Sequence, residues 1–350
     1  MPAKTPTINH KLLKELTDTC GLSGFEQEIQ NITIRELKKT CKTVKVDAMG
    51  SVIGFKPGSK KGKKLKIMLA GHMDEIGFIV NHIDDNGFLR IVPYGGFDPR
   101  NLMSQRVWVL TSKKEKLPGL LNLSKPPTFI PGAEKNPETQ VDDYFVDLLM
   151  PVADVKKKVR IGDAITMNRE YLHAGDCVSN KSMDDRIGVF VIIEAMKKVT
   201  KNQNDIYAVG TVQEEVGIRG ATTSSRGIKP DIGIALDITL AGDVLGLKPH
   251  QQVTKLREGV AIKIADSASI SNKELVKEFK ELAKKKKIKY QMEILPFGGT
   301  DAAGIQRSAS GCRVLTLSLP TRYGHSVNET CSIVDIDSAI NLLAEWLNEH

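Results

Sequence analysis

The chain has 350 residues, of which 41% are hydrophobic and 26% charged, ordinary usage that excludes a fibrous or mostly disordered protein. Its length favours two domains. An excess of 50 Lys and Arg over 42 Asp and Glu gives a net charge of +8. Much of this excess lies in lysine clusters without interleaved aromatic residues, which are typical of solvated surface rather than of a nucleic-acid-binding face. The clusters lie at 60–64, 156–158 and 284–287.

Cysteine usage and the N-terminal segment bear on the compartment. The five cysteines are scattered and lack CxxC spacing, which argues against a disulfide framework or a thiolate zinc site. The N-terminal residues show no apolar signal-peptide core, and no apolar stretch approaches the roughly 18–20 residues of a membrane span. We therefore expect a soluble cytoplasmic protein that binds neither nucleic acid nor membrane.

The first part of the chain reads as two helices followed by three strands. Leu12, Leu13 and Leu16 lie on one face of a predicted helix over 10–20, and a second helix is predicted over 25–41. The strands predicted next span 43–46, 51–55 and 65–70. The last of these is apolar throughout its centre, which indicates a buried strand.

The character of the sequence changes over residues 76–165. Short strands, predicted at 77–82, 88–92 and 106–110, are separated by Asp-Asn-Gly, Pro and Gly turn signals. Strands and helices alternate after residue 165, with helices predicted over 184–198, 272–287 and 336–347 and strands over 206–212, 232–236 and 314–319. This alternation is typical of an α/β domain built on a mostly parallel sheet. We predict that 1–75 and 166–350 form this domain and that 76–165 is an inserted small β-domain.

A His and an Asp directly follow the predicted strand 65–70. In open α/β sheets, ligands bind at the carboxyl ends of strands. His72 can bind a metal ion there while Asp74 orients its imidazole ring. A chance pair on a surface loop is the alternative.

Two acidic pairs leave similar alternatives. Asp184 and Asp185 precede a predicted helix, where they can cap its end, or one can bind a metal while Arg186 ties the other. Glu214 and Glu215 follow the strand 206–212, where one can bind a metal while the other acts as a general base. The alternative for this second pair is an exposed acidic turn.

Asp237 directly follows the predicted strand 232–236, and His325 comes soon after the strand 314–319. Each of these two residues alone is weak evidence for a metal site. The evidence is stronger when all the candidate His and carboxylate residues are taken together. Two His with three carboxylates suit two divalent ions such as Zn, Co or Mn, with one carboxylate bridging them. The absence of a thiolate from this set argues against a closed structural zinc site. Such a site hydrolyses peptide, amide or phosphate bonds.

Five ordered motifs resemble the glutamyl and tetrahedral (TET) aminopeptidases. These are dinuclear metallopeptidases of peptidase family forty-two, some of whose members are labelled endoglucanases. The motifs are GHMDEIG at 71–77, MDDR at 183–186, EEVG at 214–217, GGTDA at 298–302 and RYGHS at 322–326. The resemblance covers nearly the whole chain.

The resemblance implies a cytoplasmic aminopeptidase with two divalent ions, Zn or Co, in each subunit. His72 and Asp237 would bind one ion, Glu215 and His325 would bind the other, and Asp184 would bridge both. Glu214 would be the general base, and Asp74 would orient His72. The residues implied for the substrate pocket are His250, Gly299, Thr300 and Tyr323.

The resemblance also implies a catalytic domain formed by 1–75 and 166–350 and a dimerisation domain at 76–165. Dimers of family members commonly build a hollow tetrahedral dodecamer that admits peptides. Two alternatives stay open, a metal-dependent deacylase of N-acyl amino acids and a non-catalytic scaffold of the same fold. A glycosidase is disfavoured because paired carboxylates alone would serve it and the two His would have no role. The preferred N-terminal side chain and the native metal also stay open.

Overall fold

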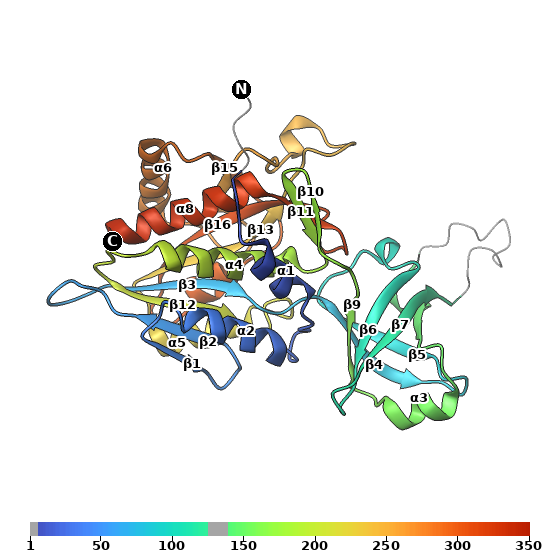
Figure 1. The fold of residues 1–350 in the computed structure, drawn as a ribbon. Coiled ribbons are helices and arrows are strands. Elements are labelled where there is room, and N and C mark those ends of the chain that lie inside the picture. The colour runs from blue at the N-terminus through green and yellow to red at the C-terminus, as the bar shows by residue number, and fades with distance from the viewer. Residues whose placement is uncertain (1–5, 125–138) are drawn as a thin grey trace.

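A computed structural model describes residues 6–124 and 139–350. In these ranges the chain forms an eleven-stranded sheet covered by helices and, beside it, a closed barrel of six strands (Figure 1). The four central strands of the sheet run parallel in the order β12–β3–β13–β16. The predicted fold class, an α/β fold on a mostly parallel sheet with a small inserted β-structure, is confirmed. The central strands are β3 (Lys66–His72), β12 (Asp205–Thr211), β13 (Ile232–Leu240) and β16 (Arg313–Arg322).

Both faces of the central sheet are buried, which explains the continuous apolar runs in its strands. In β3, Ile67 and Leu69 point into one core, and Met68 and Ala70 point into the core on the opposite face. Helices α1, α4 and α8 contribute to the first core, and α5 and α7 to the second. The eight helices of the described residues are α1 (His10–Asp18), α2 (Gln27–Leu37), α3 (Val152–Lys158), α4 (Met183–Lys198), α5 (Arg219–Ile228), α6 (Lys273–Lys286), α7 (Asp301–Gln306) and α8 (Ile333–Glu349).

The flanking strands of the sheet are mostly antiparallel. They are β1 (Thr43–Val46), β2 (Val52–Lys56), β10 (Leu172–Ala174), β11 (Cys177–Asn180), β14 (Val260–Ala265), β15 (Tyr290–Ile294) and β17 (Glu329–Ser332). One predicted boundary was wrong, because β13 continues to Leu240 and therefore contains Asp237 instead of ending before it. Its pairing with β16 continues over the whole of β13, which keeps the polar residue in the ladder.

The barrel has its own apolar core, separate from the two cores of the sheet. Its order is β4–β5–β8–β7–β6–β9, closed by pairing of β9 with β4. The strands are β4 (Gly77–Ile83), β5 (Leu89–Tyr94), β6 (Gln105–Leu110), β7 (Lys116–Leu123), β8 (Tyr144–Asp147) and β9 (Ala164–Met167). Residues 125–138, which belong to the predicted insert, lie outside the described residues. The division into domains at 76 and 165 and the role of the insert in dimerisation stay predictions.

In the part of the chain that the structure describes, the helices are too short or too polar to cross a lipid bilayer.

Candidate functional site

The predicted site residues gather where the parallel strands of the sheet end. His72 is the last residue of β3 and pairs with Thr211, the last residue of β12. Glu214 and Glu215 follow the end of β12 by three and four residues, and His325 follows the end of β16 by three. Because parallel strands end at one edge of a sheet, segments distant in sequence meet there.

The carboxylate of Asp184 lies between two imidazole rings. His72 Nε2 is 3.1 Å from Asp184 Oδ1, and His325 Nε2 is 3.3 Å from Asp184 Oδ2. The flanking acids lie close to the same nitrogens, with Glu214 Oε2 4.0 Å from His72 Nε2 and Glu215 Oε2 3.8 Å from His325 Nε2. The two adjacent glutamates therefore face different imidazoles.

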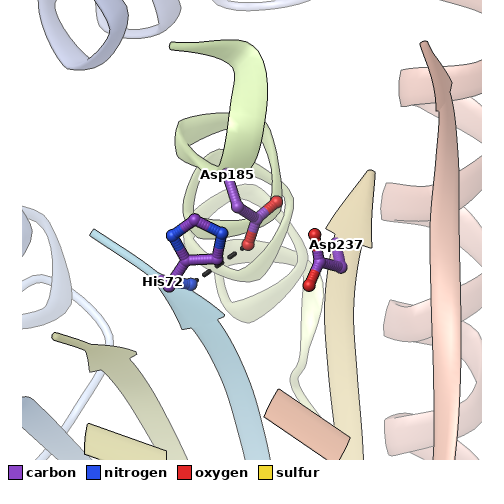
Figure 2. A group of neighbouring side chains, drawn as sticks. All are labelled: His72, Asp185 and Asp237. Carbon is purple, nitrogen blue, oxygen red and sulfur yellow. Dashed lines mark hydrogen bonds between the residues drawn. The ribbon is translucent and has the colours of Figure 1, made fainter. Parts of the chain in front are cut away.

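Figure 2 shows a second group, His72, Asp185 and Asp237, in which each residue offers a ligand atom within 4.8 Å of the others. Asp185 also holds the backbone, since its Oδ2 accepts a hydrogen bond from His72 N at 3.1 Å, the dashed line in Figure 2. Its Oδ1 accepts from Gly188 N at 3.0 Å. The alternative in which Arg186 ties one of the two aspartates was wrong.

Arg186 is fully buried and serves the N-terminal segment instead. Its Nη1 donates to the carbonyl oxygens of Leu16 and Thr19, and its Nη2 lies 3.7 Å from Glu75 Oε1. Lys181 Nζ donates to the other oxygen of Glu75. The buried charge of Glu75 is thus compensated by two cations.

Asp74 lies next to Nδ1 of His72 and accepts hydrogen bonds from several segments. His72 Nδ1 is 3.2 Å from the Asp74 carbonyl oxygen and 3.4 Å from Oδ1. The carboxylate also accepts the backbone N–H groups of Glu214 and Glu215, at 3.0 and 3.2 Å, and the hydroxyl of Ser23 at 2.6 Å. A hydrogen bond at Nδ1 fixes the ring and leaves Nε2 as the ligand atom.

The ring of His325 is held by a residue from the barrel side of the molecule. His325 Nδ1 is 2.8 Å from the carbonyl oxygen of Gly96, which follows β5. The backbone N–H of His325 donates to Glu329 Oε1 at 2.8 Å, and that of Asp184 donates to Glu329 Oε2 at 3.0 Å. A single buried carboxylate therefore fixes both partners of the Asp184–His325 pair.

The acidic and imidazole groups at this end of the sheet are called the cluster below; they are His72, Asp184, Glu214, Glu215, Asp237 and His325. The electrostatics of the cluster favour a bound cation. Burial raises the pKa of Glu215 to about 7, and the nearby carboxylate of Asp184 adds to the rise. Burial also raises the pKa values of Glu214 and Asp237 well above their ordinary range, and neighbouring carboxylates again contribute. Buried carboxylates that repel one another and face imidazole nitrogens form a donor set suited to divalent metal ions.

The four residues implied for the substrate pocket are spread out. Gly299 lines a cavity beside the cluster, whereas the other three are not among the described residues that line it. Thr300 is buried and caps α7, Tyr323 is exposed near Arg100 and Asn101, and His250 lies on an exposed turn. Their contact with substrate stays a prediction.

Sequence reasoning missed the backbone-holding roles of Asp185 and Glu329. Asp185 stands in a motif that drew attention, but its position beside Asp184 does not tell which carboxylate faces the imidazoles. Glu329 stands in an unremarkable Asn-Glu-Thr stretch at the start of β17 and carries no sequence signal.

Comparisons with known proteins bear on the family and the overall fold. The model of the M42 glutamyl aminopeptidase family matches residues 50–342. A putative aminopeptidase of Acetivibrio thermocellus is 39% identical over 341 residues, 95% of this chain and 97% of its own length. An aminopeptidase structure from the archaeon Desulfurococcus kamchatkensis superposes with a TM-score of 0.92 at 35% identity, covering 97% and 94% of the two chains.

A TET1 peptidase of Pyrococcus horikoshii, which can assemble into a tetrahedron or a large octahedral shell, superposes with a TM-score of 0.83 at 30% identity. The superposition covers 97% of this chain and 99% of that one. The resemblance inferred from the five motifs is confirmed by the family match and by these full-length similarities. The chain therefore belongs to the M42 glutamyl aminopeptidase family and is a metal-dependent aminopeptidase.

Proposed function

We propose that this aminopeptidase releases the N-terminal residue of peptides at a pair of divalent ions, Zn or Co. The ligands would be His72 and Asp237 for one ion and Glu215 and His325 for the other, with Asp184 bridging. The observation that carries this assignment is the approach of two imidazole Nε2 atoms to opposite oxygens of Asp184, at 3.1 and 3.3 Å. Bound ions of this kind lower the pKa of a water molecule and polarise the scissile carbonyl group.

Glu214 would move the proton. A carboxylate whose pKa is raised by burial accepts a proton more readily than an ordinary glutamate, and Glu214 is in this condition. As the water oxygen attacks the carbonyl carbon, one water proton passes to Glu214. The same proton then passes to the leaving amine nitrogen as the C–N bond breaks. Asp74 would keep His72 and the backbone of Glu214 in place during these steps.

The free α-amine of the substrate would lie among the carboxylates of the cluster, because a cation is stabilised there. This requirement separates an aminopeptidase from a deacylase of N-acyl amino acids, which acts where the amine is blocked. The family match disfavours the deacylase and the non-catalytic scaffold.

The test is hydrolysis of unblocked aminoacyl-anilides after removal of metal and reloading with Zn or Co. We expect turnover only with metal, none on N-acetylated substrates, and a fall of about 100-fold or more in Glu214→Gln, the size typical of lost general-base catalysis. Metal content is measured in both proteins, since the variant keeps every proposed ligand. Equal cleavage of blocked and free substrates would contradict the role of the amine, and full activity of Glu214→Gln would contradict the assigned base.

We also propose that residues 76–165 dimerise and that dimers build a larger shell. Support comes from the similarity to a TET1 peptidase that assembles into closed shells. Native mass spectrometry tests this, with a dodecamer expected at twelve times the 38.5 kDa chain mass. A species no larger than a dimer at working concentration would contradict the shell. A cytoplasmic location is part of this proposal.

A further inference from the structure

A cavity of about 450 Å³ opens beside the proposed ion ligands. Its lining includes the acidic and imidazole groups of the cluster. The rest of the lining consists of aliphatic and aromatic side chains, glycines and Thr239. The large apolar lining residues, called the apolar wall below, are Ile218, Ile238, Leu240, Leu295 and Phe297.

Three residues of the apolar wall stand on segments that carry proposed ligands, and Leu295 and Phe297 follow β15, which carries none. Ile238 and Leu240 follow Asp237 along β13, and Ile218 follows Glu215 by three residues. Leu240 and Phe297 keep 36% and 54% of their surface exposed. Large apolar side chains that stay exposed beside a polar cluster are typical of a site that binds an apolar group of a ligand.

The cavity has no charged side chain other than those of the cluster, among the described residues that line it. One lysine near the cluster does not line the cavity and is already paired. Lys263, on β14, is fully buried, with Nζ 3.1 Å from Glu293 Oε1 and 3.4 Å from Asp266 Oδ2. Thr239, a lining residue, donates its hydroxyl to the same Glu293 Oε1 at 2.6 Å.

The charges around the cavity favour an uncharged substrate side chain over a charged one. An acidic side chain would find no free cation, because two carboxylates already compensate Lys263. A basic side chain would find carboxylates only in the cluster, where they serve the ions and the α-amine. Burying a charge without a partner is strongly unfavourable, whereas an apolar side chain gains from contact with the wall.

We infer that this cavity receives the side chain of the N-terminal residue and selects uncharged apolar side chains such as those of Leu and Met over Glu and Lys. The inference rests on the proposed function. It differs from the preference that the word glutamyl in the family description suggests.

The experiment compares kcat/KM for Leu-, Met-, Glu- and Lys-anilides with the zinc-loaded wild-type enzyme. We expect Leu and Met to exceed Glu and Lys by roughly 100-fold, as unpaired polar groups and mismatched pockets produce in enzymes. Turnover led by Glu or Lys would overturn this inference and leave the aminopeptidase activity standing. No turnover of any anilide, with ions bound, would overturn both.

A charge placed in the wall tests the same argument from the protein side. Leu240→Lys puts a cation at a half-exposed lining position, where the long side chain can keep its ammonium group in water. We expect the ratio of Glu to Leu turnover to rise about tenfold or more, the effect of one new charge pair. Leu172→Lys, an equally charged change at an exposed position on β10 outside the cavity, should leave the ratio unchanged. An unchanged ratio in Leu240→Lys, or an equal shift in Leu172→Lys, would overturn the assignment of the wall.

Discussion

The carboxylate of Glu329 accepts hydrogen bonds from two segments of the site. The side-chain amide of a glutamine at this position could not accept both bonds. Its two oxygens accept the backbone N–H groups of Asp184 and His325, at 3.0 and 2.8 Å. In Glu329→Gln one carbonyl oxygen remains, and the amide NH2 faces the other N–H donor to donor. The residue is 1% exposed, so water cannot replace the lost partner. Loss of one buried hydrogen bond to a charged group costs about 1.5–3 kcal/mol.

That cost should fall on ion binding, because both segments carry proposed ligands of the second ion. At about 1.4 kcal/mol for each factor of ten, zinc affinity at this site should fall roughly 10- to 100-fold. Competition against a fluorescent chelator measures the affinity of each ion separately. Circular dichroism in saturating zinc establishes that the variant is folded.

Glu36→Gln is the matched control. Glu36, on α2, is 3% exposed, and its carboxylate also accepts from two partners, Arg35 and Lys39. Its described bonds do not reach the proposed ligands, so ion affinity should stay at the wild-type value. Wild-type affinity in a folded Glu329→Gln would refute the positioning argument. An equal loss in Glu36→Gln would refute it as well, since affinity would then follow general stability.

Three further predictions follow from the fold and the site. Chelation should abolish hydrolysis and lower Tm, both restored by zinc, because buried carboxylates lose their counter-charge; activity in the ion-free protein would contradict this. Phe190→Ala in α4, a fully buried position, should lower the free energy of unfolding by about 3–5 kcal/mol in urea titrations, and a loss under about 1 kcal/mol would show that the core is loosely packed there. Burial raises the pKa of Glu26 from 4.5 to about 7, so the folded chain holds this proton more tightly than the unfolded chain and stability falls as pH rises through that interval. The stability of Glu26→Gln relative to wild type should therefore increase between about pH 5 and about pH 8, and a constant difference would refute the shift.

The parts of the fold that follow from sequence are those whose burial is continuous. The central strand β3 and the helix α4 are apolar over most of their length, and their predicted positions agree with the structure within two residues. The helix α3 of the insert was not predicted, because it buries only Val155 and shows no apolar stripe. Asp237 was placed after its strand because a buried carboxylate within a ladder contradicts the apolar pattern that defines a buried strand.

In the candidate site, too, some residues could be predicted from the sequence and others could not. Four of the five proposed ion ligands stand in the ordered motifs, and Asp237 does not. The backbone-holding role of a carboxylate has no motif of its own, since its partners are N–H groups that every residue possesses. The bonds that Glu329 and Asp185 make to backbone N–H groups could therefore be seen only in the folded geometry.

The site contains more buried carboxylates than its proposed ions need, and the backbone explains the surplus. Asp74 holds the N–H groups of Glu214 and Glu215, Asp185 holds that of His72, and Glu329 holds those of Asp184 and His325. Asp74 and Asp185 hold N–H groups of distant segments, and Glu329 joins the distant Asp184 to His325, four residues before it. A carboxylate accepts at both oxygens, so one residue can fix two donors at a distance from each other, which neither an amide nor a hydroxyl does. Burial, and after it the nearby carboxylates, raises the pKa values of Asp185 and Glu329, and the proposed cations would relieve the repulsion among these charges.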